Sequence, residues 1–173
     1  MELKNKTVLT IVSKDFDDLE FFYPVLRLKE AGAKVIIAAE EKNKVYQGKY
    51  GLSTTSDISF NEVNIAEFDG LIIPGGWAPD YLRRLPLVLD FVRYMHQHQK
   101  TIGAICHAGW VLSSAGILKG VEITSTPGIK DDMIYAGAIW HDKSVVVSGH
   151  IITARRPPDL PLYLPELIQS LKK

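Results

Sequence analysis

Runs of consecutive apolar residues alternate with amphipathic stretches along most of the chain. Four of these runs are short and rich in β-branched residues, as expected of buried strands; they cover residues 7–12, 35–39, 70–74 and 101–105. Apolar positions at helical spacing predict helices near residues 15–31, 86–97, 107–115, 131–136 and 162–171. Strands that alternate with helices predict a single doubly wound α/β domain over residues 1–173, with a mostly parallel sheet and helices on both faces.

The first predicted helix has an unusual apolar pattern. Its inward face is expected to carry four residues: Leu19, Phe22, Tyr23 and Leu26. Pro24 lies inside this pattern, so a kink or a late helix start is expected there.

Three other segments are less regular. Residues 43–65 are polar and rich in turn residues, which predicts a small excursion from the main sheet. Residues 121–124 are a further candidate strand. Two apolar runs, 144–148 and 151–153, flank Gly149-His150, and this turn chemistry predicts a hairpin.

Composition narrows the class of protein. Lys plus Arg and Asp plus Glu both number 20, so the zero net charge favours neither nucleic acid nor an anionic membrane as a partner. A single cysteine excludes an internal disulfide and a structural zinc pattern, and no dinucleotide or P-loop motif occurs. We therefore expect a cytoplasmic protein without metal or cofactor, whose histidines at 96, 98, 141 and 150 lie at the surface or in loops.

Cys106, the only cysteine, lies where the strand 101–105 gives way to a helix. Its neighbours Ala104 and Ala108 are small, as a sharp strand-to-helix turn of the nucleophile-elbow type requires. A helix N-terminus there would favour the thiolate. Lone cysteines are more often small core residues, but the small flanking residues and the adjacent His107 favour a catalytic cysteine.

The carboxyl ends of parallel strands share one edge of the sheet, where active sites of such folds lie. Three loops leave that edge with reactive or conformationally permissive residues: Glu20 in the first, Gly75, Gly76 and Asp80 in the second, and Cys106 and His107 in the third. An attack on a carbonyl would need two N–H donors for the oxyanion, and His107 and Gly76 can supply them. His107 is the natural proton acceptor, Asp80 could orient it, and a protonated Glu20 could donate to the sulfur.

Each of these residues also has a simpler interpretation. Glu20 in a first helical turn ordinarily complements the helix dipole. Asp80 alone is more often a solvated carboxylate or a cap, and Gly75-Gly76 could be an ordinary turn. Trp77 and Trp110 are most simply packing residues, although they flank the predicted site as candidate pocket walls.

Six motifs occur in order over nearly the whole chain: Phe16–Glu20 with Tyr23-Pro24, Pro74–Gly76 with Ala78–Asp80, Ala104–His107, Pro127–Met133 with Ala136-Gly137, Ser144–Val147, and Arg155–Leu160. With these motifs the sequence resembles the ThiJ/PfpI superfamily, in particular its PfpI-like branch of intracellular proteases, deglycases and glyoxalases. The expected fold is flavodoxin-like and similar to that of class I glutamine amidotransferases.

The resemblance implies a role for each matched residue: Cys106 as nucleophile, His107 as its partner, Glu20 as the carboxylate that contacts the sulfur, and the amides of Gly76 and His107 as oxyanion hole. Asp80 stands where PfpI-like proteins often have a glutamate that completes a triad across a subunit interface. Trp77 replaces an arginine common at its position. The resemblance also implies a homodimer or a homohexamer.

Three functions remain open from the sequence. The first is a cofactor-independent enzyme acting on small reactive carbonyls or glycated groups through a hemithioacetal on Cys106. The second is peptide hydrolysis through an acyl-enzyme, with Cys106, His107 and Asp80 as triad. The third is sensing of oxidative stress by oxidation of Cys106. A glutamine amidotransferase is excluded, because neither His141 nor His150 begins the His-x-Glu motif that it needs.

Overall fold

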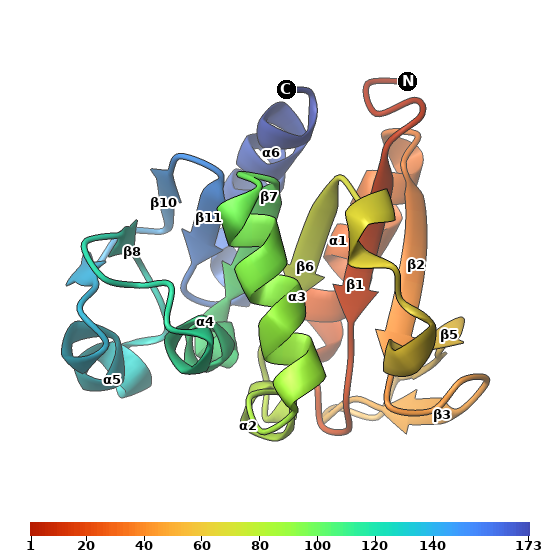
Figure 1. Cartoon of the computed structure of the whole chain (residues 1–173), viewed down its shortest axis with the longest axis horizontal. Coiled ribbons are helices and arrows are strands. Elements are labelled where there is room, and N and C mark those ends of the chain that lie inside the picture. Colours follow the sequence, from red (N-terminus) through yellow and green to blue (C-terminus); the bar gives the residue numbers. More distant parts are fainter.

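A seven-stranded sheet divides the molecule into two helical layers in the computed structural model, which describes residues 1–173 (Figure 1). The strand order is β10-β11-β7-β6-β1-β2-β5, and all neighbours run parallel except β10 and β11. The strands are β1 (Thr7–Ile11), β2 (Lys34–Ala39), β5 (Ile58–Ser59), β6 (Gly70–Ile73), β7 (Thr101–Ile105), β10 (Val145–Ser148) and β11 (Ile151–Ala154). The predicted doubly wound α/β fold is confirmed.

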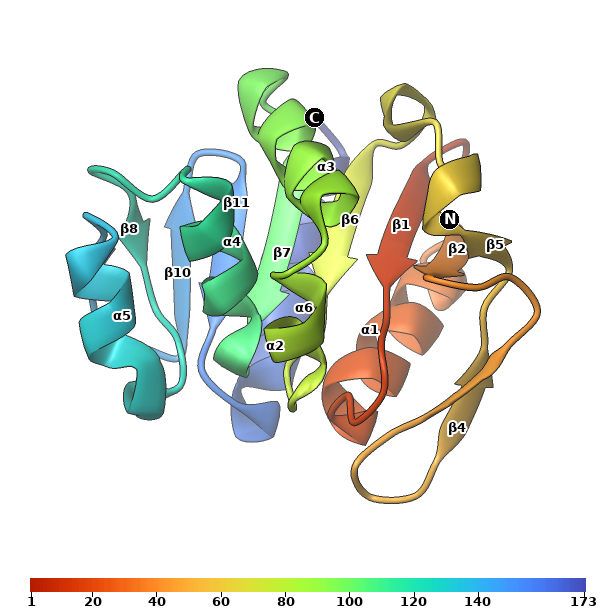
Figure 2. The same ribbon diagram turned by 60° about the horizontal axis from the view of Figure 1, so that its bottom comes forward.

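Helices cover both faces of this sheet, as Figure 2 shows. Two of them pack against each other on one face: α1 (Asp18–Glu30) and α6 (Leu160–Leu171). The opposite face carries α2 (Ala78–Leu82), α3 (Pro86–Gln97) and α4 (Gly109–Ala115), and α5 (Lys130–Tyr135) packs on the outer side of α4. None of these helices combines the length and the hydrophobicity that a membrane-spanning segment requires.

Two small sheets lie outside the main one. The excursion predicted over residues 43–65 contains an antiparallel hairpin of β3 (Val45–Gln47) and β4 (Ser53–Thr55), but its last part returns to the main sheet as β5. The strand predicted at 121–124 is reduced to β8 (Glu122–Ile123). It pairs with β9 (Ile139–Trp140), which the sequence pattern did not reveal.

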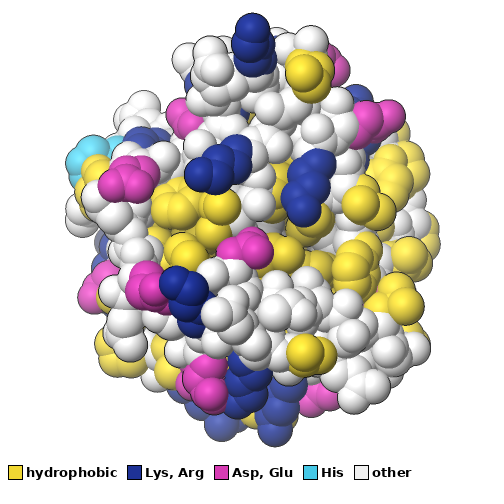
Figure 3. Space-filling model, turned by 90° about the vertical axis from the view of Figure 1, so that its right-hand side faces the viewer, with side chains coloured by type: hydrophobic (Ala, Val, Ile, Leu, Met, Phe, Trp, Pro, Cys, Tyr) yellow, Lys and Arg dark blue, Asp and Glu magenta, His cyan; other side chains and the backbone are white.

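The orientation predicted for α1 is wrong. The helix buries a different set of side chains: Asp18, Glu20, Phe21, Pro24, Val25 and Leu28. Of the four residues predicted to face inward, only Phe22 packs against the core, and it is partly buried. Leu19, Tyr23 and Leu26 face outward and are 58%, 39% and 63% exposed. The side view of Figure 3 shows hydrophobic side chains gathered on one flank of the molecule. The rotation of α1 has a functional consequence, because it turns the carboxyl group of Glu20 into the protein.

Pro24 does not delay the start of α1. The helix begins at Asp18, and Asp17 caps it by accepting hydrogen bonds from the amides of Leu19 and Glu20 at 3.2 and 3.3 Å. Such a cap satisfies N–H groups that have no partner within the helix. The cap therefore fixes the first turn, which carries Glu20.

Candidate active site

Cys106 lies at a strained turn between β7 and α4. Its backbone has φ of +62°, a left-handed conformation that non-glycine residues rarely adopt. A short 3-10 turn over Cys106–Ala108 separates β7 from α4. The side chain is 8% exposed, and its Sγ lies 3.3 Å from Nδ1 of His107. The elbow predicted from the sequence is present, and His107 folds back onto the sulfur.

Two backbone amides face the sulfur. The N–H groups of Gly76 and His107 lie close enough to the sulfur to work to lower the pKa of the Cys106 thiol. Gly76 has φ of +78°, and a Cβ built on it would lie 2.4 Å from the amide nitrogen of Asp17 and 2.5 Å from the carbonyl oxygen of Asp15. Because those atoms are backbone, only glycine fits. The structure thus brings together the two N–H groups that the sequence suggested for an oxyanion hole.

Glu20 is fully buried beside Cys106. Its Oε2 accepts a hydrogen bond of 2.9 Å from the amide of Gly75, while Oε1 has no partner. Burial, and secondly the charge of Asp17, raise the pKa of Glu20 to about 8. Glu20 is consequently a neutral carboxylic acid at pH 7, able to donate a hydrogen bond toward the sulfur.

The pKa of the Cys106 thiol is shifted in the direction opposite to the one expected from the sequence. Burial, and secondly the charge of an ionised Glu20, raise the pKa of Cys106 above its usual value, so the expected lowering by a helix N-terminus is wrong. The intervening 3-10 turn keeps Cys106 out of the first turn of α4. Because Glu20 is neutral at pH 7, the second cause is absent at that pH. The two amides near the sulfur then oppose mainly the effect of burial on the pKa of Cys106.

His107 lies between two tryptophans. Its ring centroid is 5.2 Å from that of Trp77 and 4.9 Å from that of Trp110. Burial, and secondly the charge of Lys49, lower the pKa of His107. The imidazole is therefore neutral at pH 7 and can accept the proton of Cys106 through Nδ1. The two tryptophans flank the site as the sequence suggested.

Asp80 is not part of this cluster within one chain. Its carboxylate is paired with Arg84, four residues further along the chain in the turn that follows α2, and makes no hydrogen bond or ion pair with His107. Helical spacing of four residues could have predicted this pair from the sequence. A role for Asp80 toward a neighbouring subunit remains a prediction.

The hairpin β3-β4 borders the site, which the sequence did not indicate. Phe16, in the loop after β1, forms bridges with both Gly48 and Gly76. The buried carboxylate of Asp18 accepts hydrogen bonds from the amides of Tyr50 and Leu52 at 2.9 and 2.8 Å. The hairpin is thereby attached to the same loop that positions the amide of Gly76.

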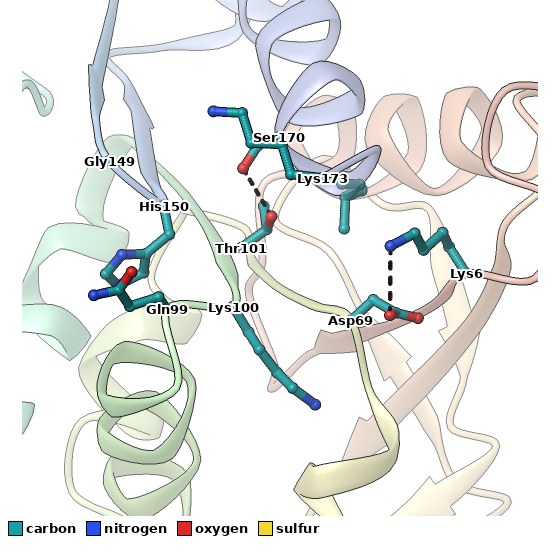
Figure 4. Close-up of a pocket in the computed structure, with 10 residues that line it drawn as sticks. Lys6, Asp69, Gln99, Lys100, Thr101, Gly149, His150, Ser170 and Lys173 are labelled. Atoms are coloured by element: carbon teal, nitrogen blue, oxygen red, sulfur yellow. Dashed lines mark hydrogen bonds and ion pairs between the residues drawn. The ribbon is translucent and has the colours of Figure 1, made fainter.

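A cavity lies at another edge of the molecule. It measures about 530 Å³ and opens at the amino ends of the strands, the edge of the sheet opposite to Cys106 (Figure 4). Its lining is mostly polar: Lys6, Asp69, Gln99, Lys100, Thr101, Gly149, His150, Ser170, Leu171 and Lys173. Two of its lysines already have partners in the protein. Lys6 pairs with Asp69 at 3.7 Å, and Nζ of Lys100 donates to the carbonyls of Ala66 and Phe68, both at 2.7 Å.

Two of the other histidines are not simple surface residues. Nδ1 of His96 and Nε2 of His150 lie 3.1 Å apart, and both side chains are half-buried. Their contact joins the end of α3 to the turn between β10 and β11. No group of three or more His, Cys, Asp or Glu side chains is arranged to hold a metal ion.

Comparison with known proteins identifies the family of this chain. A sequence profile of the DJ-1/PfpI family matches residues 6–170. The chain belongs to the DJ-1/PfpI family. It is 44% identical over 165 residues to the deglycase PfpI of Pyrococcus furiosus, covering 95% of this chain and 99% of that one. It is 37% identical over 169 residues to protein/nucleic acid deglycase 2 of Escherichia coli, covering 96% and 98%.

Solved structures of the DJ-1/PfpI family share the fold. A two-domain protein of Anabaena variabilis, with DJ-1/ThiJ/PfpI-like and ferritin-like domains, superposes with a TM-score of 0.94 at 37% identity, covering 96% of this chain and 48% of that one. DJ-1 of Schizosaccharomyces pombe gives a TM-score of 0.86 at 23% identity, with coverage of 94% and 90%. The latter shows likeness of fold alone.

Proposed function

We propose that this protein is a cofactor-independent enzyme that removes small reactive carbonyls, free or attached to amines, through a hemithioacetal on Cys106. The observation that carries the proposal is the grouping at one sulfur of a neutral base, His107, two amide N–H groups and a neutral acid, Glu20. Relatives named deglycase, at 44% and 37% identity, support the same reaction class.

The first step forms the carbon–sulfur bond. As Sγ of Cys106 bonds to the aldehyde carbon of methylglyoxal, the thiol proton passes to Nδ1 of His107. The carbonyl oxygen becomes an oxyanion, which the amides of Gly76 and His107 stabilise. With a glycated amine of the carbinolamine type, the carbon–nitrogen bond breaks as the carbon–sulfur bond forms. The thiol proton then leaves with the free amine.

The later steps release lactate. The hemithioacetal carries a hydrogen on the sulfur-bearing carbon and a ketone on the next carbon. His107 or the conjugate base of Glu20 removes this hydrogen as a proton. The proton is then returned to the neighbouring carbon, which gives a lactoyl thioester. Water then hydrolyses the thioester to lactate and restores the thiol of Cys106, so methylglyoxal plus water gives lactate overall.

Peptide hydrolysis is the less supported alternative. It needs an acid to protonate an amine leaving group and a group to orient His107. Within one chain Asp80 is occupied by Arg84 instead. Sensing through oxidation of Cys106 is less supported too, because burial raises the pKa of its thiol and lowers the thiolate fraction that peroxide attacks.

One comparison tests the proposal. The wild-type protein and Cys106→Ala are incubated with methylglyoxal, with its adduct of an amino acid, and with a fluorogenic peptide. We expect lactate and free amine from the wild type only. Equal lactate from both proteins would refute the proposal, whereas peptide cleavage that depends on both Cys106 and Asp80 would favour the peptidase. Inactivity toward all three substrates with rapid oxidation of Cys106 by peroxide would favour the sensor.

A further inference from the structure

Trp77 is a large hydrophobic side chain left exposed at the active site. It is 53% exposed although its ring centroid lies only 5.2 Å from that of His107. Its backbone is held on both sides, since its N–H donates to the carbonyl of Asp15 at 2.8 Å and its carbonyl accepts from the amide of Asp80 at 3.0 Å. The position of Trp77 is therefore fixed by the backbone while part of its indole remains open to solvent.

Trp110, on the other side of His107, differs in this respect. Its Nε1 donates to Oδ2 of Asp132 at 2.7 Å, and the guanidinium of Arg83 lies over its ring at 5.5 Å. Trp110 is thus engaged by protein groups on several sides and is half-buried. The indole nitrogen of Trp77 has no hydrogen-bond partner, and His107 is its one aromatic neighbour. Of the two tryptophans, Trp77 is the one that can receive a ligand.

The position of this free surface relative to Cys106 suggests its use. His107 touches both the sulfur, at 3.3 Å, and the indole of Trp77. Only the His107 side chain separates the sulfur from this indole, so the indole lies within reach of a substituent a few bonds long on the carbon that Cys106 attacks. In a glycated amine, that substituent is the amine-bearing side chain.

We propose that Trp77 is a specificity-determining residue that favours adducts of guanidinium groups, as in arginine, over adducts of flexible alkylamines, as in lysine. This inference rests on the function proposed above. A planar, weakly hydrated guanidinium stacks on an indole better than a compact, strongly hydrated ammonium does. Two nearby cations are already paired with carboxylates, Lys49 with Asp17 at 3.4 Å and Arg84 with Asp80, which weakens their repulsion of a bound guanidinium.

The test measures a preference. Values of kcat/KM are determined for the methylglyoxal adducts of Nα-acetylarginine and Nα-acetyllysine with the wild type, Trp77→Ala and Trp77→Phe. We expect the wild type to prefer the arginine adduct. Trp77→Ala should lower kcat/KM for that adduct about fivefold, mainly through KM, and the lysine adduct much less; Trp77→Phe should keep most of the preference. Equal losses for both adducts, or no loss, would overturn the inference.

A matched control and a binding measurement complete the design. Tyr135, 89% exposed on α5, is replaced by Ala to show that loss of an exposed aromatic elsewhere leaves the preference unchanged. Calorimetric titration of Cys106→Ala, which cannot react, should give tighter binding of the arginine adduct, and Trp77→Ala in that background should remove the difference. A wild type that turns over neither adduct refutes the proposed reaction, whereas equal binding of both adducts to Cys106→Ala refutes the role of Trp77.

Discussion

The carboxyl oxygen Oε2 of Glu20 accepts a hydrogen bond of 2.9 Å from the amide of Gly75, which lies 55 residues further along the chain. A Cβ built on Gly75 would lie 2.2 Å from the same oxygen and 2.6 Å from Cβ of Cys106. The absence of a side chain at position 75 therefore allows α1, the loop after β6 and the turn after β7 to meet. This meeting point is where a buried acid can stay neutral beside a thiol.

The first prediction concerns the reactivity of the thiol in Glu20→Gln. The pKa of Glu20 is about 8, so above that pH its charge opposes ionisation of Cys106. Glutamine cannot acquire the charge. We expect Glu20→Gln to react with iodoacetamide faster than the wild type above pH 8. The difference should be roughly tenfold if the charge of Glu20 raises the pKa of the Cys106 thiol by one unit. Alkylation rates from pH 5 to 10 provide the measurement.

The matched control for this variant is Glu30→Gln, at the exposed end of the same helix. Its alkylation profile should coincide with that of the wild type. Profiles of Glu20→Gln and wild type that also coincide above pH 8 would show that Glu20 does not ionise against Cys106.

The second prediction concerns stability against pH. The pKa of Glu20 is raised from 4.5 to about 8 on folding, so between these values the native protein keeps a proton that the unfolded chain releases. The stabilisation from this group is complete below pH 4.5 and is lost as pH rises through 8. We expect the free energy of unfolding of Glu20→Gln, from urea titrations, to fall less than that of the wild type over this range. A steeper fall in the variant would contradict the buried neutral acid.

The third prediction concerns Gly76. An alanine there must adopt φ of +78°, and its Cβ would overlap backbone atoms of the loop after β1. We expect Gly76→Ala to lower the free energy of unfolding by about 1–3 kcal/mol and to lower kcat as the amide moves away from the sulfur. Gly128→Ala is the control, since a Cβ at Gly128 meets nothing within 4 Å. Unchanged kcat in a folded Gly76→Ala would remove this amide from the oxyanion hole.

The fourth prediction concerns Asp18. Its carboxylate holds the amides of Tyr50 and Leu52 and so fastens the hairpin β3-β4 to the start of α1. We expect Asp18→Ala to lower the free energy of unfolding by about 1–3 kcal/mol and to open residues 48–52 to limited proteolysis. Asp131→Ala, on the exposed side of α5, should do neither. Cleavage sites and rates that are the same in both variants would refute the attachment.

Local sequence was enough to predict most of the sheet. The run 101–105 and the small residues around Cys106 predict β7 and the elbow, because burial and tight turns restrict residue types locally. The short helix α2 was missed, since five residues that include Pro79 carry little periodic signal. The predicted orientation of α1 is wrong because apolar residues occupy both sides of that helix, and only tertiary packing against the sheet and α6 selects the side with Phe21 and Val25.

The sequence predicts which residues form the site better than it predicts their pKa values. The resemblance to a family indicated Glu20, Cys106 and His107, and the structure brings these three together. The direction of the thiol pKa was wrong, because burial by distant segments has no signature in the residues next to Cys106. The bridges from Phe16 to Gly48 and Gly76 were likewise invisible, because they depend on long-range backbone pairing.

The separation of the 530 Å³ cavity from Cys106 matters for inhibitor discovery. Docking of compound libraries into this cavity would enrich ligands for the lysine-lined edge of the sheet, remote from the chemistry. Small electrophilic fragments, chosen for reaction with a shielded thiol rather than for bulk, are the appropriate starting point. Such fragments could then be extended along the indole of Trp77.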